Sequence, residues 1–160
     1  MVASTDLPLS PIQRYERDLL RPDFIADPAQ RMAVEELQDL YQRLLVGPER
    51  RGFLSTLRTR WAAKAAPETG LYFWGGVGRG KTYLMDAFFE SLPFERKQRT
   101  HFHRFMRDVH RQLKALAGEK NPLEKVADRI ADRVRVLCFD EFFVSDITDA
   151  MILAHLLDAL

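Results

Sequence analysis

Apolar residues recur at helical spacing through the N-terminal part of the chain, and short continuous apolar runs follow further along. The helical patterns predict helices at residues 10–20, 28–46, 49–64, 83–91, 105–116, 121–131 and from 148 onward. The apolar runs predict strands at 71–74, 100–103 and 134–139. Because strands alternate with helices after residue 70, we expect an α/β fold with a parallel sheet covered by helices.

A polar residue followed by proline marks the expected start of two helices near the N-terminus. Ser10 can cap a helix whose first residue is Pro11, and Asp27-Pro28 repeats the signal for a longer amphipathic helix. A later alanine-rich stretch is typical of a linker. We therefore expect an N-terminal helical region at residues 1–66 and a core at residues 67–160.

A glycine-rich loop lies between the first predicted strand and the next predicted helix. From Gly75 to Thr82 it matches G-x-x-x-x-G-K-[ST], the Walker A pattern, and these flanking elements disfavour a bare glycine turn. The glycines let backbone N–H groups surround phosphates, Lys81 supplies a cation, and the Thr82 hydroxyl can bind Mg²⁺. The residues expected to contact the nucleotide are Gly75, Gly76, Val77, Gly78, Arg79, Gly80, Lys81, Thr82 and Tyr83.

Two carboxylates, Asp140 and Glu141, follow the last predicted strand, as in a Walker B motif. The carboxyl end of a parallel strand faces the ligand crevice. We expect Asp140 to hold Mg²⁺, directly or through a water, and Glu141 to act as the base for the attacking water or to orient it. Lys81 is expected as a second catalytic residue. A solvated acidic turn is the alternative, and the phosphate loop disfavours it.

These motifs favour ATP hydrolysis over related reactions. A GTPase would need a guanine-binding Asn-Lys-x-Asp sequence, which the chain lacks. Small-molecule kinases share the phosphate loop but have no general need for a water-activating carboxylate beside the metal-binding aspartate. We therefore predict an ATPase that uses ATP and Mg²⁺.

Composition and chain ends add further limits. The chain has 24 basic and 23 acidic residues, so its overall charge gives no strong signal for nucleic acid. The single cysteine, Cys138, excludes an internal disulfide. Without a membrane-length apolar stretch or a secretory leader pattern, we expect a cytoplasmic protein. The apolar helical pattern at Leu160 has no stop signal, which indicates a piece of a longer protein.

Several polar residues allow both a functional and a structural interpretation. His101 and His103 could present two metal ligands, although structural or interface roles are favoured. Arg79 could contact a neighbouring protomer or the nucleotide, but solvation is favoured. The basic residues between positions 96 and 111 could bind nucleic acid, yet a solvated face balanced by acidic residues is favoured.

Residues around the two carboxylates are expected to be structural. Phe142 and Phe143 fit core packing better than a partner contact, and Cys138 fits a small buried side chain. We expect Asp146 to cap the last helix, whereas Asp149 could do the same or lie near the metal.

The phosphate loop alone identifies only a superfamily, whereas the His-Phe-His string from His101 and the Cys-Phe-Asp-Glu-Phe string from Cys138 are more specific. The segments that match one family are Gly70–Thr82, Leu84-Met85-Asp86, His101–Met106, Leu137–Phe142, Val144, Asp146-Ile147 and Asp149-Ala150-Met151. Together they resemble the ZapE-type AAA+ ATPases, a family with bacterial cell-division members and mitochondrial relatives. The resemblance extends weakly back to Asp27-Pro28-Ala29-Gln30 and covers most of the chain. The sequence departs from the family pattern at Phe143, where Gln is usual, and at Ser145, where Thr is usual.

This resemblance implies the three-layer P-loop fold of AAA+ type and a homo-oligomer, expected to be a ring. Bacterial members modulate the division protein FtsZ, and mitochondrial members are linked to quality control of respiratory-chain proteins. The sensor asparagine, the arginine finger and the small helical domain of such ATPases would follow Leu160. We therefore expect this chain to bind ATP but to hydrolyse it weakly alone.

Two functions stay open. The first is an ATPase that remodels a protein partner, and the alternative is a nucleotide-switched loader or adaptor that acts on nucleic acid. Stimulation of turnover by a division protein would support the first, whereas stimulation by single-stranded DNA would support the second.

Overall fold

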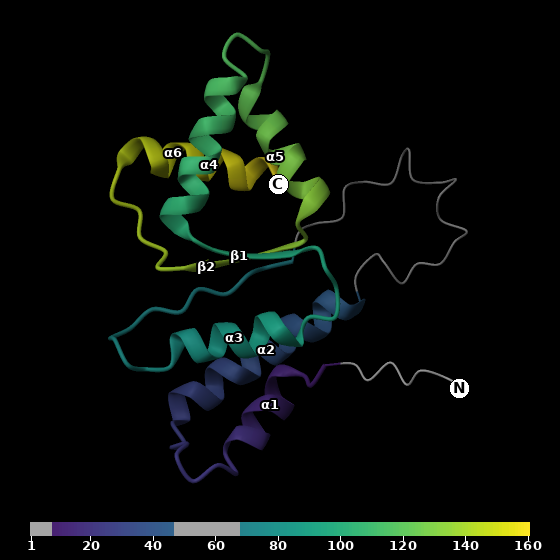
Figure 1. Ribbon diagram of the computed structural model, residues 1–160, viewed down its shortest axis with the longest axis vertical. Helices are drawn as coiled ribbons and strands as arrows, with labels where there is room; N and C mark the ends of the chain where they lie inside the picture. Colours follow the sequence, from purple (N-terminus) through teal and green to yellow (C-terminus); the bar gives the residue numbers. More distant parts are fainter. Residues whose placement is uncertain (1–7, 47–67) are drawn as a thin grey trace, which may run out of the picture. The chain divides into compact units, whose positions relative to one another are not determined.

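The computed structural model describes residues 8–46 and 68–160 (Figure 1). These residues form two compact units that divide between Pro93 and Phe94. The helix predicted at 49–64 and the linker after it lie outside the described residues. The predicted domain boundary falls in the same stretch and stays a prediction.

The N-terminal unit contains the helices α1 (Pro11–Asp18), α2 (Pro28–Val46) and α3 (Lys81–Ser91). Ser10 caps α1 through a capping box with Gln13, and α2 begins at the predicted proline, so both predicted helix starts are confirmed. The three helices pack against one another. Their buried apolar side chains, with Leu92 just after α3, are Tyr15, Val34, Leu37, Leu40, Tyr41, Leu44, Leu84, Ala87, Phe88 and Leu92.

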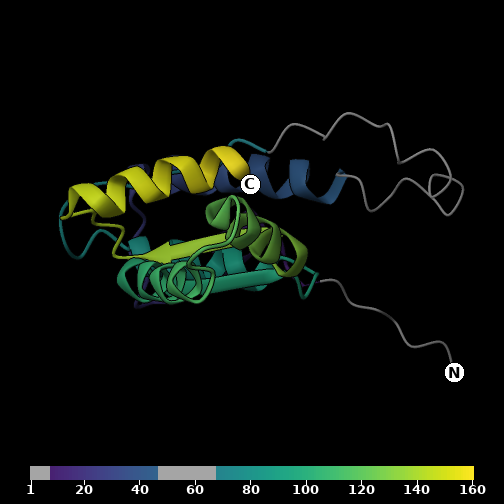
Figure 2. The same cartoon turned by 90° about the horizontal axis from the view of Figure 1, so that it is seen from above.

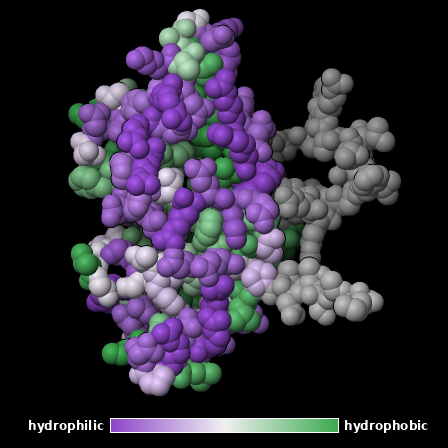
Figure 3. All heavy atoms as spheres, viewed as in Figure 1, coloured by the Kyte–Doolittle hydropathy of each residue, from purple (hydrophilic) through white to green (hydrophobic). Residues whose placement is uncertain are grey.

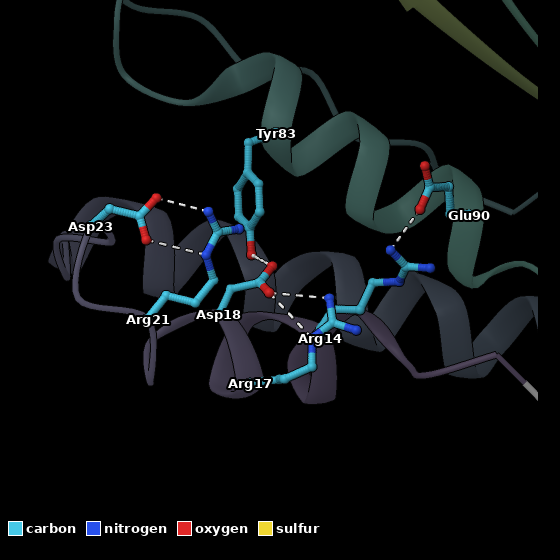
Figure 4. Close-up of polar contacts among 7 residues, drawn as sticks. All are labelled: Arg14, Arg17, Asp18, Arg21, Asp23, Tyr83 and Glu90. Carbon is cyan, nitrogen blue, oxygen red and sulfur yellow. Dashed lines mark hydrogen bonds and ion pairs between the residues drawn. The ribbon is translucent and has the colours of Figure 1, made fainter.

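Polar side chains fasten α1 to α3 (Figure 4). The Tyr83 hydroxyl donates to Asp18 Oδ2 at 2.9 Å, and Arg14 Nη1 lies 2.6 Å from Glu90 Oε2. Asp18 is only 8% exposed, and Arg17 Nη2 also donates to its carboxylate at 3.0 Å. Burial, and after it the hydrogen bond to Asp18, raises the pKa of Tyr83. Tyr83 is therefore a protonated donor in a partly buried, charge-assisted hydrogen bond.

The C-terminal unit contains β1 (Lys97–His101), α4 (Phe102–Ala115), α5 (Pro122–Arg133), β2 (Val136–Asp140) and α6 (Ile147–Ala159). The two strands lie side by side and run parallel, and α5 packs against α6 (Figures 1 and 2). This small parallel sheet with helices confirms the α/β part of the predicted fold. The buried core residues of this unit are Phe102, Phe105, Met106, Val109, Leu116, Val126, Ala127, Ile130, Leu153 and Leu156.

Residues 71–74 form no strand, so this prediction is wrong. Tyr72 is 66% exposed and Trp74 is 84% exposed, and thus the apolar run is not buried either. A strand needs a neighbouring strand to pair its backbone N–H and C=O groups. The described residues of the N-terminal unit contain no such neighbour.

The strand predicted at 100–103 is displaced toward the N-terminus. It begins at Lys97 and ends at His101, because the next residue already opens α4. The residues that set this boundary are buried at helical spacing, and they are Phe102, Phe105, Met106 and Val109. A helical period that buries four side chains prevails over a short run that matches a strand.

Hydrophilic side chains predominate on the face of the C-terminal unit drawn in Figure 3. Basic residues of the 96–111 segment contact acidic ones, with Arg99 paired to Asp140 and Arg111 paired to Asp108. The segment therefore presents a mixed rather than a uniformly basic surface. None of the helices among the described residues is long and apolar enough to cross a membrane.

Asp18→Ala should lower the free energy of unfolding by about 1–3 kcal/mol, because the partly buried Tyr83 hydroxyl loses its acceptor. Asp23→Ala is the matched control, since Asp23 pairs with Arg21 in solvent and a smaller loss is expected. Chemical denaturation followed by circular dichroism measures both variants. Equal losses would mean that the bond between Asp18 and Tyr83 adds no stability.

Candidate nucleotide-binding site

Three glycines of the phosphate loop adopt backbone angles that other residues rarely adopt. The angle φ is 140° at Gly75, 81° at Gly78 and 78° at Gly80. Gly80 also precedes the first residue of α3, so the loop leads directly into a helix N-terminus. Such a backbone can turn successive N–H groups toward one anion, and the unpaired N–H groups of the first helical turn add to them.

Lys81 is the first residue of α3 and closes the loop. Its Nζ donates to the backbone oxygens of Gly75 at 2.8 Å and Gly76 at 2.7 Å. An ammonium group has three N–H donors, so one further donor remains for a phosphate oxygen. The next residue, Thr82, is exposed and carries a hydroxyl oxygen of the kind that Mg²⁺ accepts. The loop therefore fits a nucleotide phosphate with its magnesium ion.

A hollow of about 350 Å³ lies beside the phosphate loop. Its lining comes from the start of α2, the segment before the loop, the loop itself and α3, and consists of Ala29, Gln30, Ala33, Phe73, Trp74, Gly75, Gly76, Arg79, Lys81 and Leu84. A larger hollow in the C-terminal unit, of about 460 Å³, is lined only by charged and amide side chains of α4 and α5 and contains none of the predicted site residues. The chemistry thus places the candidate site at the smaller hollow.

Asp140 is the last residue of β2 and forms a two-pronged ion pair. Arg99 Nε donates to its Oδ2 at 2.7 Å, and Arg99 Nη2 donates to its Oδ1 at 3.0 Å. A carboxylate has about four lone-pair positions, so roughly two remain after this pair forms. Asp140 can therefore keep its contact with Arg99 and still offer oxygen to a metal ion or a metal-bound water.

Glu141 follows directly and has a left-handed backbone with φ of 51°. A residue other than glycine in this region stores strain of order 1–3 kcal/mol, and such residues cluster at functional sites. Its side chain is 79% exposed, and its Oε2 lies 3.9 Å from Nδ1 of His101. His101 faces the end of β2 because it is the register partner of Asp140. The exposed carboxylate can accept a proton from water.

The side chains of several other predicted residues contact neighbouring protein side chains. Arg79 is 61% exposed, and its Nη2 lies 3.6 Å from Asp27 Oδ2. The Tyr83 hydroxyl is bound to Asp18, so its predicted nucleotide contact would use the backbone. The imidazole rings of His101 and His103 stack with centroids 5.7 Å apart.

The residues around the carboxylates separate into buried and exposed ones. Phe142 packs against the core, but Phe143 is 77% exposed, so the core packing predicted for Phe143 is wrong. Successive side chains of an extended segment point to opposite sides, and only one of the pair can face the core. Cys138 is buried as predicted, and this burial raises the pKa of its thiol to about 11.

Asp146 caps α6, as predicted. Its Oδ1 accepts hydrogen bonds from the backbone N–H groups of Thr148 at 2.7 Å and Asp149 at 3.2 Å. Hydrogen bonds from Asp149 and Thr148 lower the pKa of Asp146. Asp149 itself lies 2.6 Å from Nε2 of His110, so its carboxylate is engaged in a contact with α4.

Sequence reasoning does not find two residues that contact the motifs. Gln30 lines the hollow and donates from Nε2 to the backbone oxygen of Arg79 at 3.3 Å, while Arg99 binds Asp140. The helix-start signal Asp27-Pro28 places Gln30 in the first turn of α2, but no local pattern connects this turn to the phosphate loop.

Comparisons with known proteins identify the family. The family model for AFG1-like ATPases matches residues 9–160. The cell division protein ZapE of Escherichia coli strain K12 is 49% identical over 160 residues, which cover 95% of this chain and 43% of that protein. No solved structure matches the chain. These findings confirm the family resemblance seen in the sequence.

Two eukaryotic proteins are also similar to the chain. Lactation elevated protein 1 homolog B of Danio rerio is 42% identical over 110 residues, which cover 62% of this chain and 22% of that protein. The uncharacterized protein C115.02c of Schizosaccharomyces pombe is 34% identical in an alignment over 182 residues. This alignment covers 94% of this chain and 40% of that protein. The chain thus spans less than half the length of the curated relatives it matches. Because the family model covers nearly all of it, the chain belongs to the AFG1-like ATPase family.

Proposed function

We propose that this chain binds ATP with Mg²⁺ and takes part in ATP hydrolysis, as part of a cytoplasmic ATPase that remodels or regulates a protein partner. The observation that carries the proposal is the phosphate loop, with three glycines at positive φ and Lys81 Nζ held between the Gly75 and Gly76 carbonyls. Membership of an ATPase family supports the same reaction.

The phosphate loop performs the binding step in this proposal. Backbone N–H groups between Gly76 and Thr82 donate to the phosphates, and the N-terminus of α3 adds its partial positive charge. Lys81 directs its ammonium group at the β- and γ-phosphates, where it offsets their negative charge. These contacts are independent of the base, so they explain triphosphate binding and leave base selection to the rest of the hollow.

The carboxylates act on the metal and the water. The Thr82 hydroxyl and the Asp140 carboxylate would hold the magnesium ion, Asp140 directly or through a water. When bound, this ion neutralises charge on the β- and γ-phosphate oxygens. Glu141 accepts a proton from the attacking water, whose oxygen bonds to the γ-phosphorus as the bond to ADP breaks. The products are ADP and inorganic phosphate.

The partner and the assembly form the outer part of the proposal. The ZapE relative is named as a cell division protein, and it covers most of this chain. This name supports our proposal of a role in bacterial cell division. That the complete protein is a homo-oligomer with FtsZ as its protein partner is proposed from the family resemblance of the sequence. Turnover of the complete protein, measured with FtsZ and with single-stranded DNA, separates this proposal from a nucleic-acid loader.

Lys81→Ala should weaken ATP binding by about 10- to 100-fold, because the loop loses a charge-assisted contact to the phosphates. Isothermal titration calorimetry with ATP and Mg²⁺ measures the affinity of the chain and its variants. Lys125→Ala removes an equal charge from an exposed pair with Glu119 and should bind like the parent. Unchanged affinity in Lys81→Ala would remove the loop from the site.

Glu141→Gln should retain ATP binding and slow hydrolysis by about 10²–10⁴-fold, because the amide cannot accept the proton from water. Phosphate release by the complete protein measures turnover, and calorimetry measures binding. Glu124→Gln changes another exposed carboxylate, on α5, and should keep the parent turnover. A Glu141→Gln protein with parent turnover would exclude Glu141 as the base.

A further inference from the structure

We propose that the first turn of α2 sets the conformation of the phosphate loop, and that Gln30 is the positioning residue that transmits it. The inference rests on the proposed nucleotide function of the loop. It assigns a role in nucleotide affinity to a residue that lies in neither phosphate-binding motif. Gln30 and the loop belong to the same compact unit, although 49 residues separate Gln30 from Arg79.

The Gln30 amide contacts the loop between two glycines with positive φ. Its Nε2 donates to the backbone oxygen of Arg79 at 3.3 Å, and Arg79 lies between the two left-handed glycines, Gly78 and Gly80. In a trans peptide unit the C=O and the following N–H point in opposite directions. By holding the Arg79 oxygen, Gln30 fixes the direction of the Gly80 N–H, which belongs to the set expected to bind phosphate.

Close packing reinforces this hydrogen bond. A Cβ atom added to Gly80 would lie only 2.5 Å from Gln30 Nε2 and 3.2 Å from its Cδ. Gly80 needs to be glycine because of its φ of 78°. The short separation shows that the Gln30 amide lies directly against the backbone of Gly80.

The two ends of the Gln30 amide differ in their surroundings. Its Nε2 donates to the Arg79 oxygen, whereas its Oε1 has no hydrogen-bond partner among the described residues. Gln30 also lines the hollow beside the phosphate loop. The contact with the Arg79 peptide unit is therefore the hydrogen bond that holds this side chain against the loop.

Asp27 adds a weaker second contact. Its Oδ1 accepts from the backbone N–H of Ala29 at 2.8 Å and so caps α2, while its Oδ2 lies 3.6 Å from Arg79 Nη2. The Arg79 side chain is 61% exposed, so this long pair contributes little by itself. The contact through Gln30 is therefore the one that a substitution should test.

The helix that carries Gln30 is packed into the core of its unit. Later turns of α2 bury Val34, Leu37 and Leu40 in the core of the unit. A loop that is already fixed loses less conformational entropy when it binds a ligand, and this raises affinity without any new contact to the ligand. Gln30 thus connects a packed helix to a glycine-rich loop, which would otherwise lose more conformational entropy when the nucleotide binds.

Gln30→Met keeps the length of the side chain but removes its amide, and it should weaken Mg-ATP binding about three- to tenfold, as expected for one lost hydrogen bond. Gln30→Glu should lose at least as much affinity, because a carboxylate cannot donate to the Arg79 oxygen and adds negative charge near the phosphates. Titration calorimetry measures affinity, and hydrogen exchange of the Gly80 amide in the nucleotide-free chain measures loop order. Exchange should be faster in both variants.

Gln38→Met is the matched control on the same helix. Gln38 Oε1 accepts from the Ile12 N–H at 3.2 Å, so its loss should lower the melting temperature but leave affinity and Gly80 exchange unchanged. Parent affinity and parent exchange in both Gln30 variants would overturn the inference, and so would an equal loss of affinity in Gln38→Met. If the parent itself failed to bind ATP, or if Lys81→Ala bound it equally well, the proposed function would fail instead.

Discussion

In the proposed function, the need to surround a polyanion with backbone N–H groups constrains the path of the phosphate loop. A loop can turn successive backbone N–H groups toward one anion through residues with positive φ, and glycine adopts that region without strain. The loop meets this need at Gly75, Gly78 and Gly80. The start of α3, the contact of Lys81 with the loop carbonyls and the close approach of Gln30 all depend on this path of the backbone.

At the carboxyl end of β2 the candidate functional groups are side chains rather than backbone N–H groups. The parallel pairing of β1 with β2 positions the carboxylate of Asp140. Arg99 donates to both oxygens of Asp140. Glu141, the next residue, has a left-handed backbone conformation and an exposed side chain. The first carboxylate is thus oriented and the second is accessible, which suits the roles of metal ligand and proton acceptor that we propose for them.

Local signals in the sequence predict the helix starts and the two motifs because each depends on a few neighbouring residues. The caps at Ser10 and Asp146 are examples. Strand boundaries are harder, since the run around Phe102 fits a strand locally and its burial on α4 decides the outcome. The contact of Gln30 with Arg79 cannot be predicted in this way, because it joins residues 49 positions apart.

The first turn of α3 combines the nucleotide site with the packing of the N-terminal helices. Successive residues of a helix differ by about 100° around its axis, so Lys81, Thr82 and Tyr83 face different directions. Lys81 turns to the loop, whereas Tyr83 reaches the Asp18 carboxylate on α1. The two contacts hold the same turn from different sides. The contacts of α1 and α2 with α3 and its loop therefore help to orient the helix N-terminus that we propose to bind phosphate.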